Sequence, residues 1–121
     1  MAEQERRTVS SIATGNPSTA GNVRIFIDGS TRSHTVLRTA VIGFGTYQPG
    51  WRWSLHAGPQ TDKESENHIG YVICGCMMVK DSTGNEVKIE SGCAFELGPG
   101  GDAWVVGDAP CIALDFIPTN G

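Results

Sequence analysis

The sequence has few basic residues, and they are scattered along the chain. Nine lysines and arginines stand against thirteen aspartates and glutamates, which gives a net charge of -4 over 121 residues. Nucleic-acid binding depends on clustered cations that neutralise phosphates, so we expect no nucleic-acid partner.

Long apolar runs are also missing. No run approaches the roughly 20 apolar residues that span a bilayer. The N-terminal stretch MAEQERRTVSS has no apolar centre of the kind found in secretory signals. We therefore expect no membrane association and a cytoplasmic location.

No segment of helical length shows an apolar period of 3.6 residues, and the sequence has no Gly-rich phosphate loop or hydrolase nucleophile motif. From Val23 onward, short runs rich in β-branched and aromatic residues alternate with turns rich in Gly, Asn, Asp and Pro. About eight strands are expected, including one over WRWSLHA, residues 51–57. This pattern favours an all-β antiparallel sandwich or barrel.

The chain is expected to consist of two parts. Residues 1–21 are rich in Ser, Thr, Gly and Asn and have little to bury, so we expect a flexible N-terminal arm. Residues 22–121 are expected to form a single β-barrel domain, which is large enough to bury a core without cross-links.

Cysteine is sparse, and its spacing does not match that of a zinc ribbon. Cys74 and Cys76 are two residues apart, while Cys93 and Cys111 stand alone. Each cysteine lies in an apolar, strand-like run, where reduced thiols act as small packing residues.

Strand alternation groups the polar residues of two neighbouring segments. If residues 51–57 form a strand, Arg52, Ser54 and His56 share one face and Trp51, Trp53 and Leu55 share the other. In the next segment, His68 shares a face with Gly70, Val72, Cys74 and Cys76, and Tyr71 lies opposite. The two histidines are therefore candidates to converge inside a barrel, with Arg52 turned inward beside them as an anion contact.

The spacing of these residues resembles the first motif of the cupins. Five residues separate Gly50 from His56, and six residues, Tyr71 among them, separate His68 from Gly75. The stretch SGCAFELGPGGDAW, residues 91–104, resembles the second motif. The closest likeness is to small single-domain cupins with PGWRWS and DAWVVGD. It implies a jelly roll (a double-stranded β-helix barrel), frequent dimers, and in many members a metal held by three His and one Glu.

The sequence departs from this motif at several ligand positions. His56 stands at the first histidine position, but Gly58 stands at the second. His68 stands at the glutamate position, and Gly101 stands where close relatives have histidine. The remaining pair, His56 and His68, predicts at most a weakly held divalent transition metal such as Zn, Ni, Fe or Mn.

Three functions remain open from the sequence. The first is a polar barrel pocket that binds a small, anionic molecule, with or without the metal. The second is a metal-dependent dioxygenase, isomerase or decarboxylase acting on a small organic acid or sugar. The third is a structural module with a vestigial pocket. The substrate-binding candidates are Arg52, Ser54, Tyr71, Glu96, Asp102 and Trp104. We also expect a homodimer that pairs through its N-terminal strands, since long edge strands need covering.

Overall fold

The computed structural model describes residues 11–61 and 67–119, and nearly all of its regular structure is β-strand. A π-helical turn, η1 (Trp53–Ala57), runs into a short helix, α1 (Gly58–Thr61). The strands are β1 (Arg24–Ile25), β2 (Thr31–Val36), β3 (Ala40–Tyr47), β4 (His68–Cys74), β5 (Cys76–Lys80), β6 (Glu86–Glu90), β7 (Ala94–Leu97), β8 (Asp102–Val105) and β9 (Cys111–Pro118). The predicted all-β class is confirmed.

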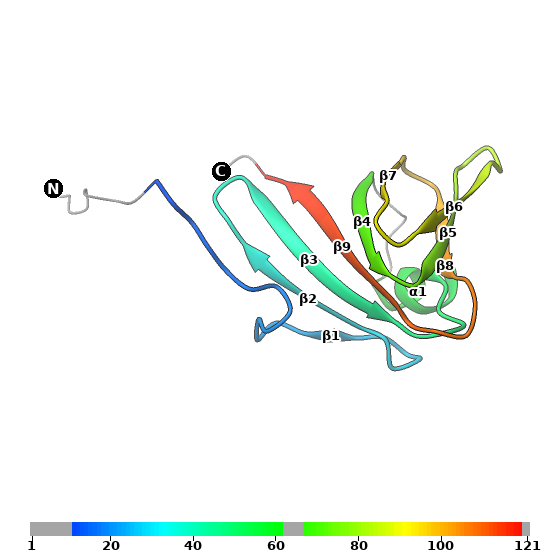
Figure 1. The fold of residues 1–121 in the computed structure, drawn as a ribbon, viewed down its shortest axis with the longest axis horizontal. Coiled ribbons are helices and arrows are strands. Elements are labelled where there is room, and N and C mark those ends of the chain that lie inside the picture. The colour runs from blue at the N-terminus through cyan, green and yellow to red at the C-terminus, as the bar shows by residue number, and fades with distance from the viewer. Residues whose placement is uncertain (1–10, 62–66, 120–121) are drawn as a thin grey trace, which may run out of the picture.

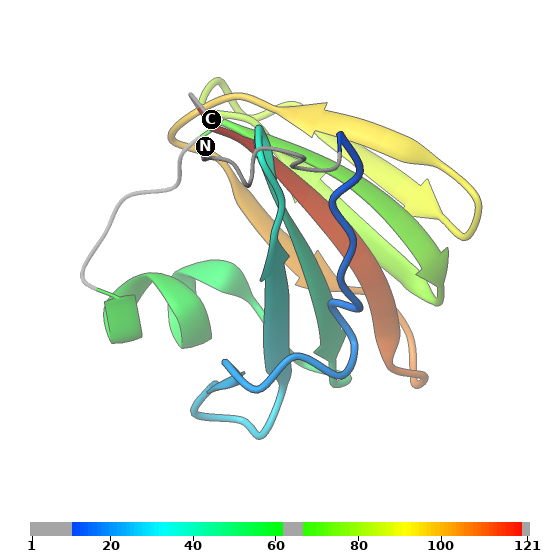
Figure 2. The same ribbon diagram turned by 90° about the vertical axis from the view of Figure 1, so that its left-hand side faces the viewer.

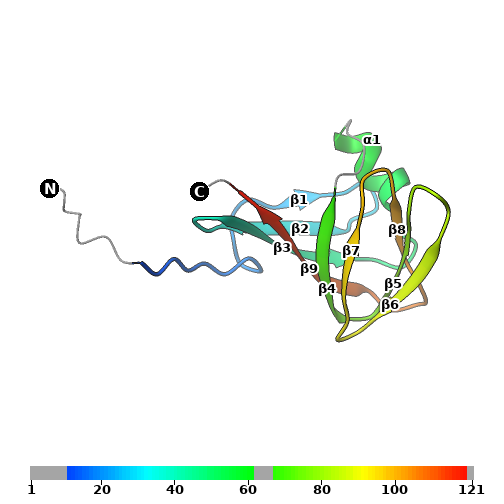
Figure 3. The same ribbon diagram turned by 90° about the horizontal axis from the view of Figure 1, so that it is seen from above.

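The strands form two antiparallel sheets. One has six strands in the order β1-β2-β3-β9-β4-β7, and the other has three in the order β6-β5-β8. The three-stranded sheet lies at the β4 and β7 end of the molecule, away from β1 and β2 (Figures 1 and 3). The helical segment stands to one side of the strands (Figure 2). The chain passes from one sheet to the other, and the two sheets together form the predicted jelly roll.

The core lies between the two sheets. Alternation in β9 turns Cys111 and Ala113 inward, and alternation in β5 turns Met77 and Val79 inward to meet them. Val72 of β4 is completely buried. Full burial of an aliphatic side chain of this kind contributes roughly 1.5–3 kcal/mol, so this layer holds the two sheets together.

A glycine allows the chain to pass from one sheet to the other between β4 and β5. Gly75 has a φ of 84°, a conformation that L side chains rarely adopt. A Cβ at this position would lie 2.5 Å from the carbonyl oxygen of Pro110 and 2.7 Å from the Cα of Cys111. Gly75 is therefore required both by its conformation and by the close approach of the neighbouring chain.

Three expectations about individual segments are wrong. Residues 53–57 form η1 instead of a strand. The run HTVLRTAVIGFG, residues 34–45, reads as one long strand, but a turn at residues 37–39 divides it, where the Leu37 amide donates to the Ala40 carbonyl. Cys74 and Cys93 are exposed, and only Cys111 is fully buried. The cause at Cys74 is a register shift between Val72 and Cys74, which ends the simple alternation.

The segment that precedes β1 packs against β2. The Ser33 hydroxyl donates to the carbonyl of Pro17, and the Asn22 amide lies 2.8 Å from Nε2 of His34. Residues 1–10 of the predicted arm lie outside the described residues, so the boundary between arm and barrel stays a prediction. Among the residues described, no helix has the length and apolarity needed to cross a membrane.

Candidate functional site

The segment that begins at Trp51 is anchored to the edge of the three-stranded sheet. Arg52 forms an antiparallel bridge with Trp104 of β8, and the Val105 amide donates to the Trp51 carbonyl at 3.0 Å. Alternation across this bridge buries Trp51 in the core, where it is 4% exposed. Arg52 faces the opposite way, with its guanidinium carbon 4.2 Å from the centre of the Trp104 ring.

This arrangement corrects the predicted direction of Arg52. Val79 and Val105 face the core, so their alternating neighbours Lys80, Asp102 and Trp104 lie on the outer face of the sheet. Arg52 joins that outer face. The expectation that it turns into the barrel is wrong, because Trp51 occupies the inward position.

Asp102 holds the beginning of η1 in place. Its carboxylate accepts from Arg52 Nε at 2.8 Å, from the Ser54 hydroxyl at 2.7 Å and from the Ser54 amide at 3.0 Å. The Ala103 amide also donates to it, at 2.9 Å. Burial alone would raise the pKa of Asp102, but the hydrogen bonds from Ser54 and Arg52 outweigh it and the pKa is lowered. Asp102 is therefore ionised, and both of its carboxylate oxygens accept hydrogen bonds from neighbouring groups.

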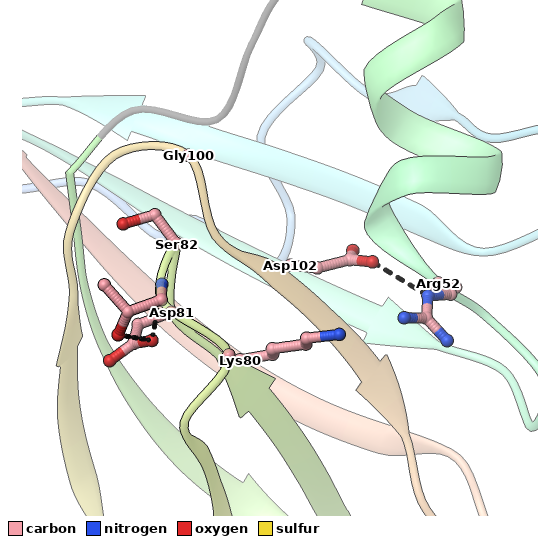
Figure 4. A pocket seen from close by; sticks show the side chains of 8 residues that line it. Arg52, Lys80, Asp81, Ser82, Gly100 and Asp102 are labelled. Carbon is pink, nitrogen blue, oxygen red and sulfur yellow. Dashed lines mark hydrogen bonds and ion pairs between the residues drawn. The ribbon is translucent and has the colours of Figure 1, made fainter.

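A pocket of about 420 Å³ opens beside this ion pair. Its walls are Arg52, Asp102 and Lys80, the turn at residues 81–84 between β5 and β6, and Gly100 in the turn before β8. Figure 4 shows the Lys80 side chain extending toward the Arg52–Asp102 pair. The pocket thus joins two of the predicted substrate-binding residues to Lys80, which the sequence argument did not select.

The turn that forms the far wall is held by its own aspartate. Asp81 accepts from the Thr83 amide and hydroxyl and from the Asn85 amide and side chain, at 2.8–3.0 Å. Hydrogen bonds from Asn85 and then Thr83 lower the pKa of Asp81 to about 2. The acceptors of Asp81 are occupied, and the hydrogen-bonded turn forms one wall of the pocket.

The two histidines predicted as metal ligands lie in different kinds of structure. His56 is in η1, and its Nδ1 accepts from the Arg52 amide at 2.9 Å, so this nitrogen caps the helical turn. His68 begins β4 on the same face as Gly70 and Val72, both buried, and it is half-buried. The predicted alternation for residues 68–72 is therefore confirmed.

The residues that the structure describes do not assemble a complete metal site. Over residues 11–61 and 67–119, no group of three or more His, Cys, Asp or Glu is placed to hold an ion. The position of the missing motif histidine is also filled. A Cβ on Gly101 would lie 2.7 Å from the Lys80 carbonyl oxygen and 2.8 Å from Leu97 Cδ1. The Lys80 carbonyl and the Leu97 side chain therefore leave no room for a histidine at position 101.

Two further predicted binding residues lie on another face. Tyr71 is 38% exposed on the outer side of β4. Glu96 is exposed on β7, opposite Ile69, and accepts from the Asn67 side chain at 3.5 Å. Four of the six substrate-binding candidates, Arg52, Ser54, Asp102 and Trp104, are thus brought together, while Tyr71 and Glu96 are not.

Inside the barrel, the structure contains an ion pair that the sequence argument missed. Arg32 of β2 donates to Asp115 of β9 through Nε at 2.9 Å and through Nη2 at 2.7 Å. The hydrogen bonds that Arg32 donates to Asp115 are the main reason that the pKa of Arg32 is raised. Burial raises the pKa of the nearby Tyr47. The pair reaches across Gly43 of β3, whose missing side chain provides the space.

Comparison with known proteins gives the fold. No model of a known protein family and no curated protein sequence matches the chain. Its structure is similar to that of KdgF from Halomonas sp., with a TM-score of 0.61 and 14% identity over 83% of this chain and 87% of that one. It is also similar to a sugar phosphate isomerase of the cupin superfamily from Silicibacter pomeroyi, with a TM-score of 0.60 and 15% identity over 83% of this chain and 71% of that one.

The fold is that of the cupins. A third similar structure is Bacillus subtilis oxalate decarboxylase, which has Mn(II) centres, with a TM-score of 0.56 and 17% identity over 81% of this chain and 28% of that one. Identities at this level establish the shared fold alone. The resemblance drawn from the two sequence motifs is confirmed at the level of the fold, while ligand and activity depend on the residues of this chain.

Lys80 and Arg32 illustrate what a sequence argument can and cannot find. Lys80 alternates with the apolar Met77 and Val79, so a period-2 pattern was available to place it on the outer face. The Arg32–Asp115 pair joins residues 83 positions apart and depends on the pairing of three strands. No local pattern signals it.

Proposed function

We propose that this cupin-fold chain binds a small anion in the pocket between Arg52 and Lys80. The observation that supports the proposal is an excess of hydrogen-bond donors that have no partner among the described residues. Lys80 has no ion pair within the described part of the chain. Among the described residues, the Arg52 guanidinium hydrogen-bonds only through its Nε, to Asp102, so its terminal nitrogens are available to a ligand in the pocket that Arg52 and Lys80 both line.

The two carboxylates of the pocket balance its two positive charges, but their acceptor oxygens are already occupied. Asp81 and Asp102 each accept four hydrogen bonds from their own surroundings. Their oxygens are committed to the turn and to η1. A ligand that enters the pocket therefore meets the Lys80 ammonium and the Arg52 guanidinium as available donors, and it satisfies them by supplying acceptor oxygens.

The size and exposure of the pocket restrict the ligand class. A volume of about 420 Å³ lies at the small end of the usual range for ligand sites, roughly 300–1,000 Å³. The Arg52 side chain is 36% exposed, so solvent weakens the attraction. We expect a small organic acid or phosphorylated compound, bound with a Kd on the order of 1 mM.

Calorimetric titration with inorganic phosphate, citrate and uncharged glucose tests the proposal. The informative variant is Lys80→Met, which removes the ammonium and retains most of the apolar stem. Lys88→Met is the matched control, because Lys88 lies on the outer face of the same sheet but does not line the pocket. A charge-assisted hydrogen bond predicts about tenfold weaker anion binding in Lys80→Met.

Comparison of the wild type with Lys80→Met and Lys88→Met distinguishes the possible results. We expect wild-type protein and Lys88→Met to bind phosphate or citrate equally, with affinity that falls as salt is added. Equal affinity of Lys80→Met and wild type would contradict the proposal. Binding of glucose as tight as that of the anions would also contradict it, because the pocket would then not recognise charge.

The other functional expectations from the sequence stay predictions. A divalent metal at His56 and His68 would need ligands beyond those described, and metal analysis of untagged protein tests it. The four free cysteines are in keeping with the predicted cytoplasmic location, since reducing compartments keep thiols unpaired. A metal-dependent enzymatic reaction is not needed for the proposed anion binding.

A further inference from the structure

The pocket between Arg52 and Lys80 has no apolar wall. Of the eight described residues that line it, four carry a charge, two carry a hydroxyl and two are glycines. Pockets for small molecules are usually lined mainly by apolar and aromatic side chains, which bury the carbon skeleton of the ligand. Trp104 does not supply such a surface, because it stacks on the Arg52 guanidinium and does not line the pocket. An alkyl or aryl group would therefore gain little by leaving water for this pocket.

The pocket is larger than a single anionic group. A phosphate group consists of one phosphorus and four oxygen atoms, and a water molecule in the liquid takes about 30 Å³. The pocket has about 420 Å³, so an anion that pairs with Lys80 and Arg52 leaves most of the space to the rest of the ligand. Because Lys80 and Asp102 lie on the outer face of the three-stranded sheet, this space is outside the barrel.

The turn between β5 and β6 presents a free hydroxyl to this space. Ser82 lines the pocket, and its hydroxyl has no hydrogen-bond partner among the described residues. The neighbouring Thr83 hydroxyl, in contrast, donates to Asp81 at 2.8 Å and accepts from the Asn85 amide at 3.1 Å. Gly100 lies close to Ser82, since a Cβ at Gly100 would be 3.4 Å from the Ser82 Cβ (Figure 4). A serine hydroxyl both donates and accepts, so it can bind a hydroxyl of a ligand.

We propose that the ligand is a phosphorylated or carboxylated polyol, that is, an anionic group attached to a hydroxylated carbon chain. This inference rests on the proposed anion site. The anionic group pairs with Lys80 and Arg52, and the hydroxyls of the chain exchange hydrogen bonds with Ser82 and with the water that remains in the open pocket. An alkyl chain in the same place would leave the Ser82 hydroxyl without a partner and would find no apolar wall.

Calorimetric titration with glycerol phosphate and propyl phosphate tests the ligand class. The two compounds share the phosphate group and the three-carbon chain and differ only in two hydroxyls; inorganic phosphate is the reference for the anion site. We expect the wild-type protein to bind glycerol phosphate about fivefold more tightly than propyl phosphate, as one additional neutral hydrogen bond predicts. Propyl phosphate should bind no more tightly than inorganic phosphate.

Ser82→Ala is the informative variant, because it removes the hydroxyl from an exposed turn position and disturbs no hydrogen bond to a described residue. It should remove most of the preference for glycerol phosphate and leave the affinity for propyl phosphate unchanged. Ser91→Ala is the matched control, since Ser91 is also exposed but lies in the turn after β6 and does not line the pocket. It should bind all three compounds like the wild type.

The results distinguish this inference from the anion site on which it rests. If inorganic phosphate binds but propyl phosphate binds as tightly as glycerol phosphate, the polyol class is wrong and the anion site remains. A preference for glycerol phosphate that Ser82→Ala leaves unchanged also overturns the inference, because the hydroxyls are then recognised elsewhere. If none of the three phosphates binds, the anion site itself is wrong, and the ligand class is wrong with it.

Discussion

Gly43→Ala is expected to break the ion pair inside the barrel. A Cβ on Gly43 would overlap Nη2 of Arg32 and Oδ1 of Asp115, the atoms that close the pair. Both atoms end side chains, so the side chains can rotate away and the backbone of β3 can keep its place. The cost is then mainly the loss of the paired geometry.

The exposure of the pair sets the size of this effect. Arg32 is 23% exposed and Asp115 is 19% exposed, which lies between a surface pair and a buried one. Exposed pairs contribute about 0–1 kcal/mol, and breaking a buried pair costs about 3–5 kcal/mol. We expect the free energy of unfolding to fall by about 2 kcal/mol, and the melting temperature by about 8 °C for a chain of this length.

Urea unfolding followed by tryptophan fluorescence measures this change. The control is Gly98→Ala, because a Cβ on Gly98 would have no atom within 4 Å. It should stay within about 0.5 kcal/mol of wild type. In an Asp115→Asn background, Gly43→Ala should cost less, since the pair is already weakened. A Gly43→Ala protein as stable as the Gly98→Ala control would refute the reasoning.

Two further predictions concern titratable groups. Asp81 has a folded pKa of about 2, below its ordinary value of 3.8, so its contribution to stability is present above about pH 4 and is lost as the pH falls toward 2. Urea unfolding at pH 5, 4 and 3 should show this loss, and Asp81→Asn should show a shallower one; equal slopes would contradict the role of the turn. Burial, with Cys74 and Cys76 nearby, raises the pKa of Cys111 to about 11. A thiol reagent at pH 8 should therefore label exposed Cys74 and Cys93 first and Cys111 only on unfolding, as peptide mass spectrometry can check; labelling of Cys111 at the rate of Cys74 would count against it.

The strand pattern of the sequence was sufficient to predict the fold. Short β-branched runs between turn residues predict an all-β domain, and the spacing of Gly50, His56, His68 and Gly75 resembles a cupin motif. Both follow from local chemistry, because alternation and turn residues act over a few positions. For the same reason, alternation correctly placed His68, Gly70 and Val72 on one face of β4.

The direction in which a face points is not a local property. Residues 51–57 read as a strand, yet only Trp51 and Arg52 pair with β8 before the chain turns into η1. The alternation in the sequence places Trp51 and Arg52 on opposite faces. The pairing with the neighbouring sheet then decides that the tryptophan faces the core and the arginine faces outward.

The pocket and the Arg32–Asp115 ion pair depend on the tertiary structure in the same way. Arg52 meets Asp102 across 50 positions, and Arg32 meets Asp115 across 83. Each contact requires several strands to pair in one register, and that register is selected by the burial of all strands together. The sequence by itself determined which residues alternate and where the chain turns. Only the closed barrel decided which charges meet, because the free energy of packing both sheets exceeds any local preference.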